Sequence, residues 1–189
     1  MSVPSIVSLL PDRRFLEQTI FPYLLGNLEW HKILFVGCRW YTRSYNALFA
    51  AKEYVTIDHD PKQQRYGAPK HITDSLENLA AHIGPRELDV IICNGVLGWG
   101  LNQPAAIERA FAASRCCLRE GGLLIVGWND TPKRRVRSSR GNGTFLDECE
   151  AVNRFAKFSF PGVGSWRCRT RSWNRHVFDF YVKPPQART

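Results

Sequence analysis

The stretch from residue 32 to residue 58 holds two short apolar runs joined by a segment with helical periodicity. The first run, 32–37, is rich in β-branched and aromatic residues and ends in Gly37, and the second, 54–58, ends in Asp58. Such runs are typical of strands buried on both faces of a parallel sheet. The apolar residues of 42–52 lie on one side of a helix. The stretch therefore predicts a nucleotide-binding βαβ unit, in which an acid ~20 residues after the turn glycine accepts hydrogen bonds from a ribose.

Strand-like and helical segments continue to alternate as far as residue 130. Short apolar runs at 71–74, 88–93 and 123–128 predict strands, and the segments 75–83 and 103–118 have helical periodicity. After a basic, glycine-containing segment at 131–143, which we expect to be a mobile loop, 144–158 predicts a helix, and 166–173 and 176–183 predict an antiparallel hairpin. The fold class is therefore α/β, with a doubly wound, mostly parallel sheet of seven strands and a C-terminal antiparallel hairpin.

The chain of 189 residues is long enough for one domain with a substantial core. We expect a single domain over 1–189, with a helical cap at 1–31, a core at 32–130, and a loop, helix and hairpin at 131–189. The cap predicts two short helices broken by Pro22 and ending near Gly26. It either covers an edge of the core or closes over a ligand, and both alternatives stay open.

Composition favours a soluble globular protein, with 44% hydrophobic and 23% charged residues. The six cysteines form no CxxC pair, so we expect reduced, mostly buried thiols instead of disulfides or a zinc site. The apolar run at 6–10 is cut short by Pro11 and Asp12, and no run approaches the ~20 residues that a membrane span requires. We therefore expect a cytoplasmic protein without a membrane partner.

The net charge of +9 is concentrated in two segments. Patches of this kind bind phosphates, anionic substrates or nucleic acid, although most such runs are solvated surfaces. The basic residues of the first segment are Lys133, Arg134, Arg135, Arg137 and Arg140, and those of the second are Arg167, Arg169, Arg171 and Arg175.

The turn after the first strand limits the choice of ligand. A dinucleotide site requires three glycines, but here only Gly37 is present, and Trp40 and Tyr41 stand where the backbone would approach a pyrophosphate. The lysine pattern of a P-loop is also absent. A ligand with a ribose and no pyrophosphate fits better, and S-adenosylmethionine is the commonest molecule of this kind.

Five segments in this order and spacing resemble the motifs of class I S-adenosylmethionine-dependent methyltransferases: 32–37, 56–61, 72–76, 89–97 and 118–128. The resemblance implies S-adenosyl-L-methionine as cofactor. It also implies roles for individual residues. Gly37 would contact the methionine part, Asp58 the ribose hydroxyls, His59 and Ser75 the surroundings of the adenine, Asp74 the adenine amino group, and Asn94, Gly95 and Val96 the methionine carboxylate or sulfonium.

The chain departs from the family pattern at two places. Phe35 replaces the family's acid within the first strand, and Arg39 and Tyr41 replace its second and third glycines. Arg39 would compensate for the lost backbone contacts by reaching the cofactor carboxylate. Simpler structural roles remain for the same positions, since Asp58 could cap a helix and the pair Asp74 and Ser75 is also a good helix cap.

Residues that follow parallel strands share one rim of the sheet, where ligands bind in open α/β folds. The start of the last, antiparallel strand lies on that rim too. His176 is our preferred general base and Asp130 the second candidate, although a histidine at this position is often only solvated. Trp99, Asn102 and Asn129 are the candidate substrate residues, and the segment 173–175 also lies on this rim. We expect no metal, because Asn94 stands where catechol-type relatives have an acid.

Three functions follow in order of preference. The first is methyl transfer to an O or N atom of a small-molecule acceptor, in a pocket lined by Trp40, Trp99, Trp128 and the amino-terminal helices. The second is methyl transfer to RNA or another nucleic acid, whose phosphates would bind the basic loop 133–140. The third is a catalytically inactive S-adenosylmethionine-binding protein. The sequence identifies neither the acceptor nor an oligomeric state.

Overall fold

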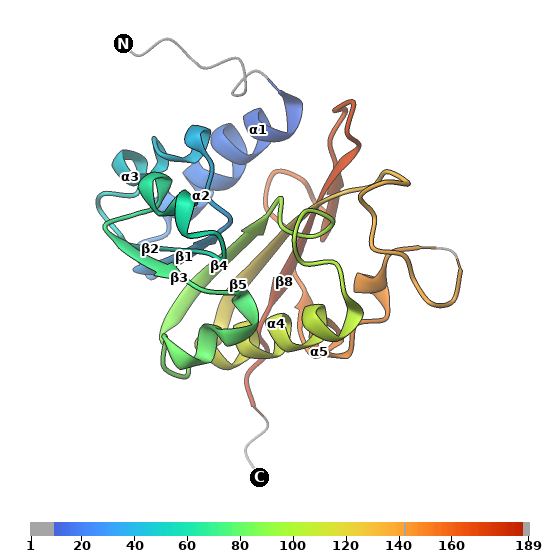
Figure 1. The fold of residues 1–189 in the computed structure, drawn as a ribbon. Coiled ribbons are helices and arrows are strands. Elements are labelled where there is room, and N and C mark those ends of the chain that lie inside the picture. The colour runs from blue at the N-terminus through green and yellow to red at the C-terminus, as the bar shows by residue number, and fades with distance from the viewer. Residues whose placement is uncertain (1–9, 142, 187–189) are drawn as a thin grey trace.

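The apolar run that begins at Lys32 forms the central part of a sheet in the computed structural model, which describes residues 10–141 and 143–186. The sheet has the order β3-β2-β1-β4-β5-β8-β6, and β7 also pairs with β8 (Figure 1). The first five strands in this order are parallel, and β8 runs antiparallel to β5. The strands are β1 (Lys32–Val36), β2 (Glu53–Asp58), β3 (Lys70–Thr73), β4 (Leu88–Asn94), β5 (Leu118–Asn129), β6 (Ala156–Lys157), β7 (Arg167–Arg169) and β8 (His176–Val182).

Side chains of the central strands alternate between two apolar layers, as the period of two along a strand requires. In β1, Leu34 and Val36 join one layer, whereas Ile33 and Phe35 join the other. Both layers are buried, which explains why these strands are continuously apolar in sequence. The predicted doubly wound α/β fold, with parallel strands and an antiparallel C-terminal end, is confirmed. The sheet has eight strands instead of the predicted seven, because the segment expected to be helical at 144–158 ends in the short strand β6.

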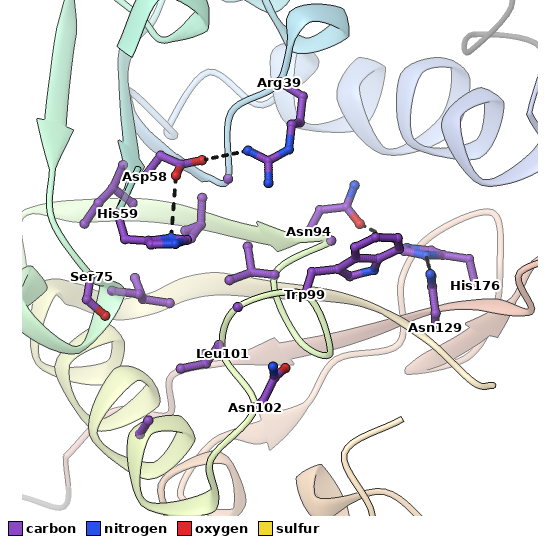
Figure 2. Close-up of a pocket in the computed structure, with 18 of the residues that line it drawn as sticks. Arg39, Asp58, His59, Ser75, Asn94, Trp99, Leu101, Asn102, Asn129 and His176 are labelled. Carbon is purple, nitrogen blue, oxygen red and sulfur yellow. Dashed lines mark hydrogen bonds and ion pairs between the residues drawn. The ribbon is translucent and has the colours of Figure 1, made fainter. Parts of the chain in front are cut away.

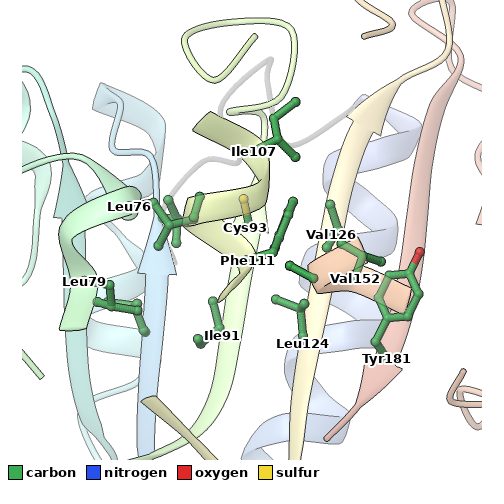
Figure 3. Packing of buried hydrophobic residues seen from close by; sticks show 14 of the residues in the cluster. Leu76, Leu79, Ile91, Cys93, Ile107, Phe111, Leu124, Val126, Val152 and Tyr181 are labelled. Atoms are coloured by element: carbon green, nitrogen blue, oxygen red, sulfur yellow. The ribbon is translucent and has the colours of Figure 1, made fainter. Parts of the chain in front are cut away.

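One layer lies under α4 (Pro104–Cys117), α5 (Glu150–Asn153) and the 3₁₀ helix at Leu76–Ala81. Ile107 and Phe111 of α4 belong to the same buried cluster as Cys93 and Val126 of the sheet, and Phe111 lies between the latter two (Figure 3). The long helix matches the prediction at 103–118, with Pro104 at its first turn, where the missing N–H is not needed.

The other layer lies under the amino-terminal helices, which run as one continuous coil rather than two separate pieces. They are α1 (Pro11–Phe15), a π-helical turn (Leu16–Ile20) and α2 (Phe21–Gly26). The N–H of Phe21 reaches the carbonyl of Leu16, five residues back. This wider turn precedes Pro22, which has no N–H and whose ring would crowd a regular helix, so the proline changes the helix type without ending it.

The predicted helices at 42–52 and 75–83 are both shorter than the sequence suggests. The segment after β1 forms only a 3₁₀ turn (Trp40–Thr42) and α3 (Tyr45–Leu48), and the segments after β2 and β3 are 3₁₀ helices at Pro61–Tyr66 and Leu76–Ala81.

The prediction of one continuous helix over 144–158 is wrong. The chain forms a 3₁₀ turn (Phe145–Asp147), then α5, then β6. Cys149 is extended, with φ −63° and ψ 116°, and the carboxylate of Glu108 from α4 accepts the N–H groups of Glu150 and Ala151 at 2.6 and 2.9 Å. A side chain from a distant helix thus caps α5 and starts it late.

The described part of the basic segment 131–143 packs on its surroundings, in contrast to the mobile loop that we expected. The guanidinium of Arg134 lies 3.4 Å from the ring centroid of Trp99 and donates to the carbonyl of Gly98 at 3.0 Å. The N–H of Ser139 donates to Glu148 at 2.5 Å. These contacts hold the segment against the fold at both Arg134 and Ser139.

The predicted C-terminal hairpin is confirmed, because β7 pairs with β8 in antiparallel register. Buried Asp179 of β8 accepts from the indole N–H of Trp128 at 2.9 Å and from Arg167 at 2.5 and 2.8 Å. Trp128 therefore belongs to the core and does not line an acceptor pocket. Trp40 is 56% exposed and lies outside the cavity described below.

All six cysteines are free thiols, and four of them are buried, whereas Cys116 is exposed. Burial raises the pKa of Cys93 to about 12, so this thiol stays protonated. In the part of the chain that the structure describes, no helix has the length and apolar character to cross a membrane. The run at 6–10, apart from Leu10, lies outside the described residues.

Truncation of Phe111 tests the core under α4. Phe111 is fully buried, so Phe111→Ala should lower the free energy of unfolding by about 3–5 kcal/mol through lost burial and a residual cavity. Urea denaturation measures this change. The matched control is Leu28→Ala at a side chain 82% exposed, which should change the value by less than about 0.5 kcal/mol. Equal effects at the two positions would contradict the placement of α4.

Candidate functional site

A cavity of about 630 Å³ opens at the carboxyl ends of β1, β2 and β4 and at the start of β8. Its volume lies within the range of about 300–1,000 Å³ that is usual for small-molecule sites. Figure 2 shows two groups of polar side chains along it, one around Asp58 and one around His176. The first helix closes part of the cavity with Leu10, Asp12 and Arg13.

Gly37 ends β1 at the cavity wall with φ +89°, a conformation that favours glycine. A Cβ atom at this position would lie 2.9 Å from Cγ2 of Val96. Its N–H donates to the carbonyl of Ile57 at 2.9 Å, which ties the turn to the end of β2. The turn therefore requires glycine both for its backbone conformation and for the close approach of the β4 loop.

Asp58 ends β2 and is 6% exposed, with its carboxylate at the cavity. Oδ2 accepts the N–H of Cys38 at 2.7 Å, and Oδ1 accepts the N–H of Asp60 at 2.9 Å. An ionised carboxylate has about four acceptor positions, so each oxygen retains capacity for a ligand.

Two further cavity residues stand beside this carboxylate. Nη1 of Arg39 lies 3.8 Å from Oδ2, and Nδ1 of His59 lies 3.6 Å from Oδ1 (Figure 2). Both side chains are largely solvent-accessible, at 46% and 65%. Arg39 donates to the carbonyl of Cys38 at 3.0 Å, which holds its guanidinium at the cavity edge.

Asp74 and Ser75 line the same side of the cavity, and Ser75 also acts as a helix cap. Oγ of Ser75 accepts the N–H of Glu77 at the start of the 3₁₀ helix. Oδ2 of Asp74 lies 2.7 Å from Nε2 of His82, and its Oδ1 accepts from Asn78 and from the N–H of Ser75. These contacts, with His82 foremost, lower the pKa of Asp74 to about 2. Bonds within the fold, two of them to side chains, therefore already occupy both carboxylate oxygens of Asp74.

The second polar group is a row of three buried side chains from β4, β8 and β5. Nε2 of His176 lies 3.0 Å from Oδ1 of Asn94, and Nδ1 lies 2.6 Å from Oδ1 of Asn129 (Figure 2). The three residues are 3–6% exposed and line the cavity. A Cβ atom at Gly127 would lie 2.0 Å from the Asn94 amide oxygen, so a glycine there makes room for the row.

Burial lowers the pKa of His176 to about 4, so the imidazole is neutral at pH 7. A neutral imidazole has one N–H and one lone pair. The neutral ring can donate to only one of the two amide oxygens that face it, so pairing of the other ring nitrogen requires that amide to turn its NH₂ group toward the ring. The two amides hold the orientation of the His176 ring.

Asp130 does not line the cavity. Its carboxylate forms ion pairs with Arg135 and Arg169, and it is 6% exposed. Burial acts to raise the pKa of Asp130, but the two guanidinium groups outweigh burial and lower it. Both oxygens are thus committed to ion pairs with these two arginines.

The β4–α4 loop supplies the remaining predicted residues. Gly95, Val96, Trp99 and Asn102 all line the cavity. Trp99 is 51% exposed and carries Arg134 on its ring, so the basic segment braces the loop at the cavity mouth.

Sequence reasoning missed Asp12 and Tyr41 as cavity residues, whereas Asn174 was expected on this rim. Asp12 reads in sequence as the acid of a first helical turn, and Tyr41 as an obstacle in the turn after β1. Only the packing of the first helix across the sheet brings Asp12 next to Asn174, 162 residues away. Within the described residues, no group of three or more His, Cys, Asp or Glu side chains is arranged to hold a metal ion.

The buried imidazole predicts a specific pH dependence of stability. The unfolded chain protonates His176 near its ordinary pKa of about 6.5, whereas the native state does so only near 4, so stability is lost as pH falls through this window. The loss should reach about 3 kcal/mol. Urea denaturation from pH 7 to pH 4 of the wild type and His176→Gln measures it, and the variant should show a shallower decline. Parallel curves would contradict the burial of a neutral ring.

No family model and no curated protein matches the sequence. Solved structures do resemble the fold. N-methyltransferase NodS from Bradyrhizobium japonicum WM9 in complex with S-adenosyl-L-homocysteine matches with a TM-score of 0.66 and 14% identity, over 96% of this chain and 92% of that chain. The 1,6-didemethyltoxoflavin-N1-methyltransferase of Burkholderia thailandensis, with 1,6-didemethyltoxoflavin and S-adenosylhomocysteine bound, gives 0.58 and 13% over 98% and 94%. An S-adenosylmethionine-dependent methyltransferase from Methanosarcina mazei gives 0.62 and 13% over 89% and 98%. The chain therefore has the fold of the class I S-adenosylmethionine-dependent methyltransferases.

Proposed function

We propose that this protein uses S-adenosyl-L-methionine to methylate an O or N atom of a small-molecule acceptor. The observation that carries the proposal is the buried carboxylate of Asp58 beside Gly37, at a cavity that continues to the polar row around His176. One end of the cavity thus offers a ribose-binding acid and the other offers groups suited to an acceptor.

The residues at the first end fit the cofactor. Asp58 keeps free acceptor capacity on both oxygens after its two backbone bonds, which suits the two hydroxyls of a ribose. Gly37 presents backbone without a side chain to the cavity, which suits the methionine part. Arg39 would bind the cofactor carboxylate through a charge-assisted hydrogen bond.

The adenine would lie between His59 and the segment Asp74–Ser75, which lines the same side. The carboxylate of Asp74 already bonds Asn78 and His82. A hydrogen bond from the adenine amino group to Asp74 therefore requires one of these bonds to open. Asn94, Gly95 and Val96 would flank the methionine part from the end of β4.

Bound S-adenosylmethionine supplies an electrophilic methyl group on a sulfonium. This chain's task is then to hold the acceptor atom in line with that group, and such positioning supplies much of the rate. Trp99 and Asn102 at the mouth and Asn129 at the inner wall are the proposed acceptor contacts. His176 is the proposed proton acceptor, because it is neutral at pH 7 and lines the cavity. We assign no proton transfer to Asp130, whose carboxylate is paired with Arg135 and Arg169.

The similar structures support a small-molecule acceptor, since one of them is an N1-methyltransferase with its small substrate bound. The packing of the basic segment argues against a nucleic-acid substrate as the first choice. Arg134 stacks on Trp99, Arg135 pairs with Asp130, and Arg140 lies 3.7 Å from Glu148, so these charges are engaged within the fold. Cytoplasmic location remains our expectation.

Cofactor binding tests the proposal through the melting temperature. S-adenosylmethionine at about 100 times its dissociation constant stabilises a protein by about 2.7 kcal/mol, which corresponds to a rise of roughly 5–10 °C for a chain of this size. Differential scanning fluorimetry should show this rise for the wild type. In Asp58→Asn it should be abolished or strongly reduced, because one ribose acceptor is replaced by a donor group.

The control is Glu150→Gln, a carboxylate-to-amide change at a side chain 76% exposed on α5, which should keep the full shift. Both variants are first compared without ligand, so that a general loss of folding is recognised. Absence of a shift in the wild type would overturn cofactor binding. A normal shift without methylation of any acceptor would instead favour the inactive binding protein, and RNA binding with strong salt dependence would favour the nucleic-acid enzyme.

A further inference from the structure

The indole of Trp99 lines the cavity with one of its faces covered and much of its surface exposed. The Cζ atom of Arg134 lies 3.4 Å from the centroid of the ring, which places the guanidinium against one face. Trp99 is nevertheless 51% exposed. Its exposed surface therefore belongs to the opposite face and to the edges of the indole. Figure 2 shows the indole apart from the polar group around Asp58.

Several contacts hold this indole in a fixed orientation. Arg134 also donates to the carbonyl of Gly98 at 3.0 Å, so it binds the residue before Trp99 as well as the ring. Gly98 has φ +78°, and a Cβ atom there would lie 1.9 Å from the carbonyl oxygen of Arg134. Only glycine allows the two backbones to approach so closely. The N–H groups of Trp99 and Gly100 both donate to the carbonyl of Val96, at 3.0 and 3.1 Å.

The segment that carries Arg134 is itself anchored at its start. The buried carboxylate of Asp130 forms ion pairs with Arg135 and with Arg169 of β7. The N–H groups of Arg134 and Arg135 donate to the carbonyl of Thr131 at 3.0 and 2.8 Å, which forms a tight turn. Asp130 thus contributes to the site by holding the segment from which the guanidinium of Arg134 projects.

Single exposed apolar side chains are common on protein surfaces and require no explanation. Trp99 differs from them because it is rigidly held and lies on a cavity wall. A planar ring binds well to such a surface by offset stacking, and an arginine on the far face of the same indole extends the stack. The loop therefore has the form of a stacking platform.

The guanidinium also determines which charge the platform accepts. An aromatic face normally attracts cations. Here one cation already lies against the indole, so a second cation on the opposite face would be repelled by the charge of Arg134. The pair of Arg134 and Trp99 consequently favours an uncharged ring over a cationic one.

Other polar groups that line the cavity are compatible with an uncharged ligand. The imidazole of His176 is neutral at pH 7, and Asn102 and Asn129 contribute amides. Asp12 and Arg13 also line the cavity, but they carry opposite charges. Stacking on the indole and hydrogen bonds to amides together suit a planar molecule with a polar substituent.

We propose that the methyl acceptor is an uncharged aromatic molecule whose ring stacks on Trp99, and that Arg134 is the positioning residue that holds the indole for it. This assignment rests on the proposed function and narrows its substrate class from small molecules in general to planar aromatic ones. The methylated O or N atom is then a ring atom or a substituent of that molecule.

Two matched pairs of probes test the assignment. Benzamide and cyclohexanecarboxamide share the amide and differ in the ring, whereas quinoline and 1-methylquinolinium share the ring and differ in charge at neutral pH. Ligand-observed NMR titrations measure their dissociation constants on the full chain saturated with S-adenosylhomocysteine. We expect benzamide to bind about threefold more tightly than cyclohexanecarboxamide, although the saturated ring is the more hydrophobic. Quinoline should bind more tightly than 1-methylquinolinium.

The first variant, Trp99→Leu, removes the stacking surface and keeps an apolar side chain. It should weaken benzamide binding by about 2- to 10-fold, the range for losing one aromatic partner. It should also bring benzamide and cyclohexanecarboxamide to nearly equal affinity. The thermal shift by S-adenosylhomocysteine should stay as in the wild type, which shows that the cofactor end of the cavity is intact.

The second variant, Arg134→Gln, removes the positive charge behind the indole. The preference for quinoline over 1-methylquinolinium should fall by about threefold or more, because the repulsion of the cation is lost. An Arg134 that only stabilises the fold would give a different result, a lower melting temperature with an unchanged preference. Arg137→Gln, at an exposed arginine of the same segment, is the matched control and should leave all four affinities unaltered.

The outcomes separate the two proposals. If S-adenosylhomocysteine binds but benzamide binds no more tightly than cyclohexanecarboxamide, or Trp99→Leu keeps the wild-type preference, the aromatic assignment is overturned while the proposed function stands. An unchanged charge preference in Arg134→Gln overturns the role of Arg134. If S-adenosylhomocysteine does not bind the wild type, the proposed function itself fails.

Discussion

The carboxylate of Asp58 at the end of β2 binds the turn that follows the adjacent strand β1. The candidate site depends on this hydrogen-bonded connection. Its Oδ2 accepts the N–H of Cys38, and the neighbouring N–H of Gly37 donates to the carbonyl of Ile57. The turn after β1 is thereby held against β2 although it lacks the second and third glycines of related turns. The acid keeps unused acceptor positions at the cavity, so the same carboxylate that fixes the turn remains able to bind a ribose.

The other end of the cavity depends on the antiparallel strand β8, which lies beside β5. This pairing brings His176 opposite Asn129 and within reach of Asn94 on β4. Buried polar groups of this kind stabilise a fold only when they are paired, and each ring nitrogen has an asparagine amide within hydrogen-bond distance. Asp12 and Asn174 differ, because each has a buried oxygen without a hydrogen-bond partner in the described part of the chain.

The candidate residues at the ends of parallel strands could be predicted from sequence, because a residue that directly follows a buried strand lies on the rim of the sheet where the strands end. Gly37, Asp58 and Asn94 were located in this way, and all three line the cavity. The same argument failed for Asp130, which follows β5 but turns to Arg135 and Arg169. Strand position fixes which end of the sheet a residue occupies, but the direction of its side chain depends on charges that come from elsewhere in the chain.

The sequence by itself determined the alternation of strands and helices, the two buried faces of the central strands and the antiparallel last strand, since these follow from local hydrophobic periodicity. Only the tertiary structure decided where helices end and which polar groups meet. Glu108 of α4 caps α5 and replaces the long helix expected at 144–158, and the path of the first helix brings Asp12 to Asn174. These contacts join residues that are far apart in the chain, so no local pattern encodes them and packing alone selects them.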